Sequence, residues 1–201
     1  MNRASLLLTV LMGGLTFALW SFLNLSANEP PWPATIKGFC FSPMRGALAP
    51  APGQFPSLAE IEEDLALLQG KSYAVRTYTV QSTMADVARL AKDYQLNVML
   101  GAWISQNEQE NEEEIENLIR IFQENSDNVV RLIVGNEALL RGDRTVEQMI
   151  GYLERVREDV YAPVSLAEPW HIWLKYPELV KHVDFIAVHI LPYWEGIDVE
   201  Q

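Results

Sequence analysis

The chain has 201 residues, of which 49% are hydrophobic, and its formal net charge is −12 at pH 7. We expect no nucleic-acid partner, because binding to a phosphate backbone draws its free energy from Lys and Arg side chains. Cys40 is the one cysteine, which excludes an intrachain disulfide and a cysteine-based zinc cluster; we expect it to pack as a small apolar group.

The amino-terminal residues 1–28 differ in character from the rest of the chain. Arg3 precedes the uncharged, apolar residues 4–25, a run of about 22 residues that is long enough to cross a membrane. We interpret residues 1–28 as a membrane anchor that leaves the remaining chain on the outer side, periplasmic or extracellular. The alternative is a secretory signal cleaved near residues 25–27, Leu-Ser-Ala. The proline-rich residues 29–35 predict a stiff spacer.

From residue 36 to residue 201, short apolar strands alternate with amphipathic helices. The strands are predicted at residues 36–41, 73–78, 97–103, 129–134, 163–167 and 184–190. The helices are predicted at residues 57–70, 83–94, 108–125 and 145–159. The third helix begins with a run of glutamates, from Glu108 to Glu114, which we interpret as a solvated face.

This alternation predicts a parallel sheet, because parallel neighbours need a crossover connection and a helix is the usual one. We predict the α/β class and a (β/α)8 TIM barrel that is incomplete, with about six β/α units. The 166 residues from 36 onward fall short of the roughly 250 that a complete barrel takes.

We expect neither a cofactor nor a metal. No G-x-G-x-x-G sequence follows the first strand, so nothing is present to cradle a dinucleotide. A metal-dependent hydrolase would have to use His171, His182 and His189, but these lack the paired spacing of metal ligands.

Polar and aromatic residues gather where the predicted strands end. Asn136 and Glu137 follow the fourth strand, at the edge where alternating α/β folds place their chemistry. We interpret Glu137 as a general acid and Asn136 as a partner for a substrate hydroxyl; the alternative is a simple turn followed by a helix. Rings beside carboxylates and amides suit a sugar. The other candidate binding residues are Arg76, Tyr78, Trp103, Glu168, Trp170, His189, Tyr193 and Trp194.

Four motifs together resemble a known family. They are GFCFSP at residues 38–43, RTY at 76–78, VGNE at 134–137 and VHILPYWE at 188–195. They resemble the bacterial branch of glycoside hydrolase family 17, which acts on β-1,3-glucan. The resemblance implies a retaining barrel enzyme, hydrolase or transglycosylase, with Glu137 as acid/base and Asn136 beside the sugar hydroxyl nearest the cleaved bond. It also implies that Arg76, Tyr78, His189, Tyr193 and Trp194 line one subsite.

A retaining enzyme needs a second carboxylate as its nucleophile, about 5 Å from the first. The resemblance implies a position at the end of a seventh strand, beyond residue 201, and leaves Glu168 and Glu195 in the cleft wall. We therefore expect a nucleophile outside this chain. The competing hypothesis is a glucan-binding or partner-binding module without catalysis.

Overall fold

The computed structural model describes residues 2–24, 33–45 and 53–198. Contacts between residues divide the chain into two units, Met1–Ala34 and Thr35–Gln201. The expected cleavage site at residues 25–27 and most of the spacer at 29–35 lie outside the described residues.

The first unit contains helix α1, Arg3–Leu23. The side chain of Asn2 caps it by accepting a hydrogen bond from the amide of Ser5 at 2.8 Å. None of its residues is buried, and its 21 residues are long and apolar enough to cross a membrane. A signal sequence at an amino terminus has the same length and composition, so α1 fits either role.

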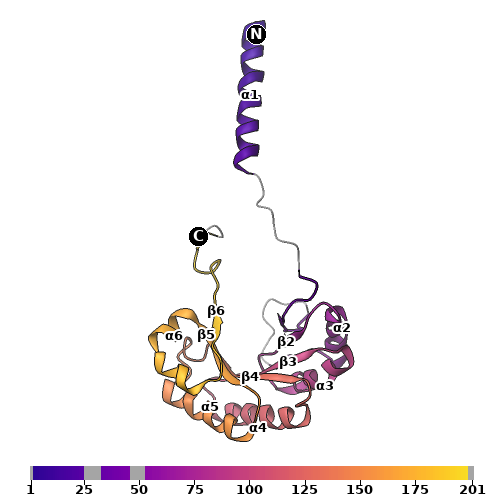
Figure 1. The fold of residues 1–201 in the computed structure, drawn as a ribbon, viewed down its shortest axis with the longest axis vertical. Coiled ribbons are helices and arrows are strands. Elements are labelled where there is room, and N and C mark those ends of the chain that lie inside the picture. The colour runs from indigo at the N-terminus through magenta and orange to yellow at the C-terminus, as the bar shows by residue number, and fades with distance from the viewer. Residues whose placement is uncertain (1, 25–32, 46–52, 199–201) are drawn as a thin grey trace. The chain divides into compact units, whose positions relative to one another are not determined.

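The second unit is built on six parallel strands that lie side by side in sequence order (Figure 1). They are β1 (Phe39–Cys40), β2 (Ala74–Arg76), β3 (Asn97–Ala102), β4 (Val129–Asn136), β5 (Val164–Pro169) and β6 (Ala187–His189). Parallel strands in sequence order, joined by helical crossovers, form an incomplete (β/α) barrel. The predicted fold, an incomplete TIM barrel of about six units, is confirmed.

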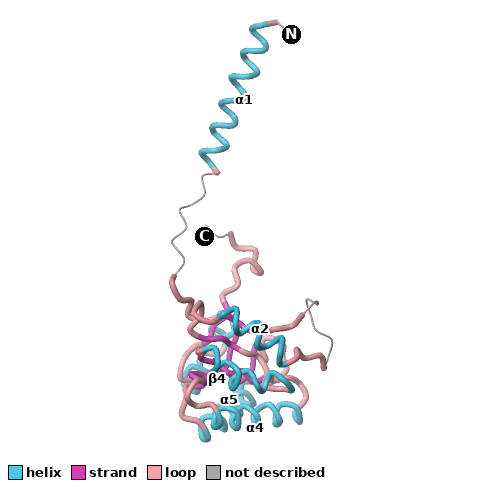
Figure 2. Tube along the Cα trace, turned by 90° about the vertical axis from the view of Figure 1, so that its right-hand side faces the viewer, coloured by secondary structure: helices cyan, strands magenta, loops and turns pink. Residues whose placement is uncertain are grey.

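The helices cover one side of the curved sheet (Figures 1 and 2). They are α2 (Leu58–Leu68), α3 (Val87–Ala91), α4 (Glu108–Glu124), α5 (Val146–Asp159) and α6 (Trp170–Lys175), with 3₁₀ helices at Ser82–Asp86, Lys92–Tyr94 and Pro177–His182. The predicted helix at 83–94 is thus split into three pieces, and α6 was not predicted. Capping boxes begin α2 at Ser57 and α5 at Thr145.

The core lies between the sheet and these helices. Its fully buried side chains include Val98, Leu100, Ile115, Leu118, Leu132, Met149 and Leu153. Two predictions about burial are wrong. Glu114 on α4 is only 1% exposed although its neighbours in the glutamate run are more exposed, and Cys40 is exposed on β1.

The strands β2 and β3 approach closely because residue 101 is a glycine. A Cβ atom on Gly101 would collide with the carbonyl oxygen of Thr77. The hydroxyl of the fully buried Thr77 accepts a hydrogen bond from the amide of Gly101 at 3.0 Å. This contact fixes the exits of β2 and β3, from which Tyr78 and Trp103 follow directly.

Candidate active site

The chain turns sharply as it leaves β4. Gly135 and Glu137 both have left-handed backbone conformations, with φ of +85° and +57°. The φ of Gly135 is one that L side chains rarely adopt, so the turn favours a glycine there. Glu137 is held in its uncommon conformation by its amide, which donates to the carbonyl of Ala167 on β5 at 2.8 Å. Such strained positions in non-glycine residues cluster at functional sites.

Glu137 and three other predicted residues form one hydrogen-bonded network at the carboxyl ends of β2, β4 and β6. Nδ1 of His189 lies 2.6 Å from Oε1 of Glu137. The guanidinium of Arg76 reaches both neighbours, with Nη1 3.3 Å from Nε2 of His189 and Nη2 2.8 Å from Oδ1 of Asn136. The side chains of Glu137 and His189 are 26% and 16% exposed, so the network is largely shielded but still reachable.

The network determines which nitrogen of His189 carries the proton. A guanidinium can only donate hydrogen bonds, so Nε2 of His189 must accept from Arg76. The proton of the neutral ring is therefore on Nδ1, where it is donated to Oε1 of Glu137. Arg76 also takes the amide oxygen of Asn136, which leaves the amide NH₂ group of Asn136 able to donate to a ligand.

Tyr78 lies beside this network. The guanidinium carbon of Arg76 is 4.9 Å from the centre of its ring. Burial, with a hydrogen bond involving the thiol of Cys40, raises the pKa of Tyr78 to about 12. Its hydroxyl therefore keeps its proton at neutral pH, and its oxygen can accept a hydrogen bond from a ligand hydroxyl.

Arg141 contacts the loop that presents Glu137, although it was not among the predicted site residues. Its guanidinium donates to the carbonyl oxygens of Asn136 and of Ile104, the latter at 2.8 Å, and pairs with Asp143 at 2.6 Å. The same group stacks 4.3 Å from the ring centre of Trp103. Arg141 thus ties the loop after β4 to the end of β3. Its position five residues after Asn136, in the loop that presents Glu137, was the available signal.

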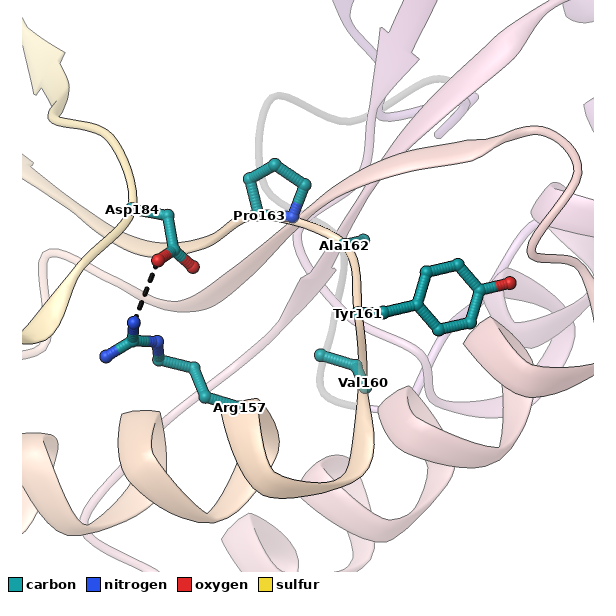
Figure 3. Close-up of a pocket in the computed structure, with 6 residues that line it drawn as sticks. All are labelled: Arg157, Val160, Tyr161, Ala162, Pro163 and Asp184. Carbon is teal, nitrogen blue, oxygen red and sulfur yellow. Dashed lines mark hydrogen bonds and ion pairs between the residues drawn. The ribbon is translucent and has the colours of Figure 1, made fainter.

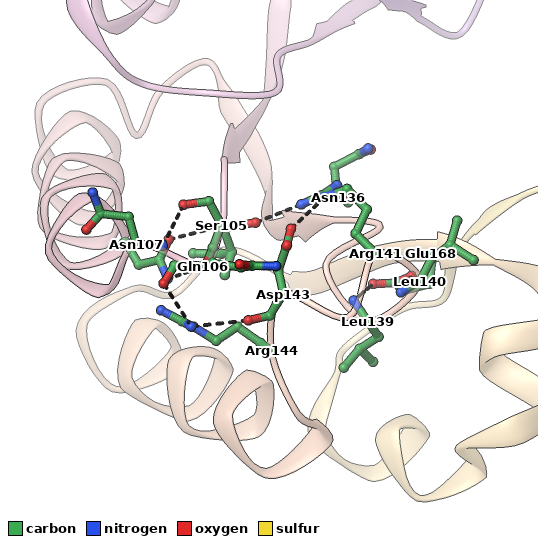
Figure 4. Close-up of polar contacts among 12 residues, drawn as sticks. Ser105, Gln106, Asn107, Asn136, Leu139, Leu140, Arg141, Asp143, Arg144 and Glu168 are labelled. Atoms are coloured by element: carbon green, nitrogen blue, oxygen red, sulfur yellow. Dashed lines mark hydrogen bonds and ion pairs between the residues drawn. The ribbon is translucent and has the colours of Figure 1, made fainter. Parts of the chain in front are cut away.

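Glu168 is placed differently from the prediction that it contacts sugar. It is fully buried at the end of β5, and its two oxygens accept the amides of Leu139 at 2.8 Å and Leu140 at 3.3 Å (Figure 4). Burial raises its pKa to about 7, and the nearby charge of Glu137 adds to this effect. The enclosed carboxyl group holds the backbone of the loop that follows β4.

The remaining aromatic candidates stand apart from Glu137. The indole nitrogen of Trp170, the first residue of α6, donates to Oε1 of Glu195 at 2.7 Å. Tyr193 and Trp194 follow β6 and contact each other, with ring centres 5.5 Å apart. They are 84% and 79% exposed, so the structure does not bring these two rings into the network of Glu137.

The histidines other than His189 lie elsewhere. His182 pairs with Glu154 at 3.0 Å, and His171 is exposed with its ring against that of Trp170. Within residues 2–24, 33–45 and 53–198, no three side chains of the metal-binding types gather in one place.

A separate hollow of about 400 Å³ lies at the opposite end of β5 from Glu168, with Arg157, Tyr161 and Asp184 among its lining residues (Figure 3). Asp184 is fully engaged there, because one oxygen pairs with Arg157 at 2.9 Å and the other accepts the amide of Val164 at 2.9 Å. In a (β/α) barrel the chemistry lies at the carboxyl ends of the strands, so this hollow is not the candidate active site.

Residues 38–201 match the family described as the BtgE/BtgC glycoside hydrolase domain. The chain belongs to this glycoside hydrolase family. The resemblance to glycoside hydrolase family 17 is confirmed, because the solved structures that resemble this chain include a β-1,3-glucanosyltransferase of that family from Rhizomucor miehei. That match has a TM-score of 0.69 and 26% identity over 82% of this chain and 60% of the other.

Three further relatives extend the comparison. An active-site mutant of the Rhizomucor miehei β-1,3-glucanosyltransferase in complex with laminaritriose matches with a TM-score of 0.68 and 27% identity, over 81% of this chain and 59% of the other. The probable glucan endo-1,3-beta-glucosidase btgC of Aspergillus clavatus is 29% identical over 73% of this chain and 23% of its own length. A glucan 1,3-beta-glucosidase of Arthroderma benhamiae is 25% identical over 74% of this chain and 50% of its own length. The chain therefore spans a quarter to a half of these two curated relatives.

Proposed function

We propose that this protein acts on β-1,3-glucan as a retaining hydrolase or transglycosylase, with Glu137 as its general acid and base. The observation that carries the proposal is the network in which Arg76 orients His189 and His189 holds one oxygen of Glu137. The other oxygen, Oε2, is the one that can face a substrate. The family match and the relatives named for β-1,3-glucan support the choice of substrate.

In the first step, Glu137 gives its proton to the oxygen that joins two glucose units. The bond from this oxygen to the anomeric carbon breaks, and a second carboxylate bonds to that carbon. Glu137, now ionised, then takes a proton from water or from a hydroxyl of another sugar, whose oxygen displaces the carboxylate. His189 donates from Nδ1 to Oε1 of Glu137 and so stabilises its ionised form between the two steps.

We propose that the second carboxylate comes from polypeptide outside the described residues. Glu168 is buried, and each of its oxygens accepts a backbone amide of the loop after β4. Glu195 accepts from Trp170 on the segment that follows β6. Both carboxylates are thus engaged within the chain, and we propose neither as the group that bonds to the anomeric carbon.

The contacts to sugar are proposed from the same geometry. The free amide hydrogens of Asn136 can donate to a sugar oxygen, and the hydroxyl oxygen of Tyr78 can accept from a sugar hydroxyl. Trp103 is 37% exposed and offers part of its ring for stacking on a sugar face. We place the exposed rings of Trp170, Tyr193 and Trp194 farther along the glucan chain, on the segments that follow β5 and β6.

One observation favours a second candidate, a module that binds glucan without cleaving it. Of the carboxylates predicted for the site, Glu137 is the one that is both partly exposed and within the network, and Glu168 is enclosed. A site with a single available carboxylate binds sugar but does not complete the retaining reaction.

We also propose that α1 anchors the protein to a membrane, with the barrel unit on the outer side. The charge of Arg3 next to a long apolar helix supports this orientation. A protease added to intact cells should then degrade the barrel unit and leave α1 in the membrane fraction. Release of the whole chain without α1 into the medium would instead identify a cleaved signal.

The test of the enzymatic proposal uses the protein at its natural length, incubated with laminaritriose and with longer β-1,3-glucan. Hydrolysis gives shorter sugars and transfer gives longer ones, which mass spectrometry separates. We expect Glu137→Gln to lower the rate by at least about 10²-fold while the protein stays folded. Glu178→Gln, a change of an exposed residue in the 3₁₀ helix Pro177–His182, should not alter the rate.

Three results distinguish the candidates. Cleavage by the Glu137→Gln variant at the wild-type rate would remove Glu137 from the mechanism. Binding of glucan by the unaltered protein with no product of either kind would favour the binding module. The absence of both binding and product would overturn β-1,3-glucan as the substrate.

A further inference from the structure

A second buried carboxyl group, that of Glu114, takes no part in the network of Glu137. It lies on α4, which covers the outside of the sheet, and it is 1% exposed. A carboxyl group is costly to bury, so its partners indicate what it does. Thr79 donates its hydroxyl to Oε1 in a short hydrogen bond, and the amide of Val80 donates to Oε2 at 3.0 Å.

These contacts join two loops at the carboxyl end of the sheet. Thr79 and Val80 follow directly after Tyr78, in the loop that leaves β2. The backbone of Trp103, at the end of β3, forms a further hydrogen bond with Glu114. One carboxylate on a covering helix therefore holds the segments that carry Tyr78 and Trp103, two of the predicted sugar contacts.

The preceding turn of α4 holds the same region. Asn111 is fully buried, three residues before Glu114 on the same helix face. Its side chain accepts the amide of Ser105 at 2.8 Å and donates to the carbonyl of Ser105 at 2.9 Å. The loop after β3 is thus fixed to α4 on both sides of Ile104, and the position of Trp103 depends on that attachment.

Trp103 links this attachment to the site. Its ring is stacked on the guanidinium of Arg141, which in turn donates to the carbonyl of Asn136. The ring nevertheless remains 37% exposed and available to a ligand. A displacement of the Trp103 backbone would move both the ring and the group on which it is stacked.

We propose that Glu114 is a positioning residue that holds Trp103 as a stacking platform for a glucose unit of the bound glucan. The inference rests on the proposed function, because it takes β-1,3-glucan as the ligand. Glu114 itself does not touch sugar. It acts through three hydrogen bonds, two to the loop after β2 and one to the backbone of Trp103.

Both carboxyl oxygens of Glu114 are needed for this role. Its burial raises its pKa to about 7, and the charge of Glu110 on the same helix adds to this, while the donors on Thr79, Val80 and Trp103 oppose it. A glutamine keeps the shape but has one acceptor oxygen where the carboxylate has two. Glu114→Gln is therefore the variant that removes the attachment with the least change in packing.

The experiment is a double-mutant cycle on laminaritriose binding, measured by calorimetry on the full chain in detergent. The four proteins are the wild type, Trp103→Ala, Glu114→Gln and the double variant. We expect each single change to weaken binding about fivefold or more, and Glu114→Gln to have less than about a twofold effect when Trp103 is already alanine. Glu113→Gln, an exposed neighbour on α4, serves as the matched control and should bind as the wild type does.

The inference would be overturned if Glu114→Gln weakened binding equally with and without the Trp103 ring. A merely structural role of Glu114 would give that result. Unchanged binding by Trp103→Ala would also overturn the inference, because the platform would then not exist. In both cases the wild type still binds glucan, so the proposed function survives. Thr79→Val removes one hydrogen bond from the opposite side with little change in shape, and it should reproduce a smaller part of the same coupled loss if Glu114→Gln folds poorly.

Discussion

Nδ1 of His189 lies 2.6 Å from Oε1 of Glu137, although 52 residues separate them in the sequence. They meet because β4 and β6 flank β5, and because the left-handed backbone of Glu137 lifts its side chain out of the strand. Arg76 approaches from β2 and completes the arrangement. The hydrogen bonding of Glu137, the candidate acid, therefore depends on residues at the ends of three strands.

Arg76→Lys should damage the site although it keeps the charge. A lysine ammonium lacks the planar fork that reaches His189 and Asn136 at once, so His189 loses its orientation. We expect the rate of glucan cleavage by the natural-length protein to fall about 10- to 100-fold, with a smaller change in KM. Arg131→Lys, on an exposed arginine of β4, is the control. A wild-type rate for Arg76→Lys would show that the fork is not needed.

Gly101→Ala should destabilise the barrel unit. The new methyl group would collide with the backbone oxygen of Thr77, which cannot move without separating β2 from β3. We expect the free energy of unfolding to fall by about 1–3 kcal/mol, measured by urea denaturation. Gly151→Ala on α5 is the control, because its methyl group would meet no atom within 4 Å and alanine favours a helix. Equal stabilities of the two variants would contradict this account.

The two buried acids predict a dependence of stability on pH. The pKa values of Glu114 and Glu168 rise from 4.5 to about 7 in the folded chain, so the folded state binds their protons more tightly than the unfolded state does. Their contribution to stability is therefore fully present below pH 4.5 and is lost as the pH rises through about 7. The Glu168→Gln variant should lack the part of this loss that comes from Glu168, which is up to about 3 kcal/mol of the free energy of unfolding between pH 4.5 and pH 8.

Urea unfolding at several pH values gives the free energy of unfolding as a function of pH. The contribution of Glu168 is the difference in the slope of this dependence between the wild type and Glu168→Gln. The exposed Glu178→Gln should keep the wild-type slope. If Glu168→Gln also kept the slope, Glu168 would not titrate in this range.

Arg141→Ala should loosen the loop that presents Glu137. The loop would lose its hydrogen bond to Ile104 and its stacking on Trp103, while Glu168 would still hold the amides of Leu139 and Leu140 from below. We expect hydrogen exchange at these two amides to accelerate about tenfold. Arg120→Ala, which removes an exposed ion pair with Glu124 on α4, should leave them unchanged. Unaltered protection in Arg141→Ala would mean that Glu168 alone holds the loop.

The parts of this molecule that follow from local pattern were predictable from the sequence. Hydrophobic periodicity and capping residues located α2, α4 and α5 and all six strands, because a buried face and a helix cap each depend on residues of a single segment. The ends of the strands were less accurate. β1, β2 and β6 are shorter than predicted, while β4 and β5 extend two residues farther, since pairing with neighbours decides where a strand stops.

The candidate site was predictable only where a residue lies at the end of a strand. Arg76, Asn136, Glu137 and His189 met that condition, and the structure places them together. The buried positions of Glu114 and Glu168 were not predictable, because their partners are backbone amides of distant loops. Arg141 was missed for the same reason, since its contacts to Ile104 and Trp103 cross between two strand exits.

In the described part of the chain, the last strand of the sheet, β6, has an unpaired edge beside the candidate site. It pairs with β5 on one side, and its final residue is the histidine that touches Glu137. Its other side has backbone groups that no strand among the described residues occupies. Any polypeptide that adds a strand there would lie directly against that histidine. We therefore expect the contact between His189 and Glu137 to change when a strand pairs along this border.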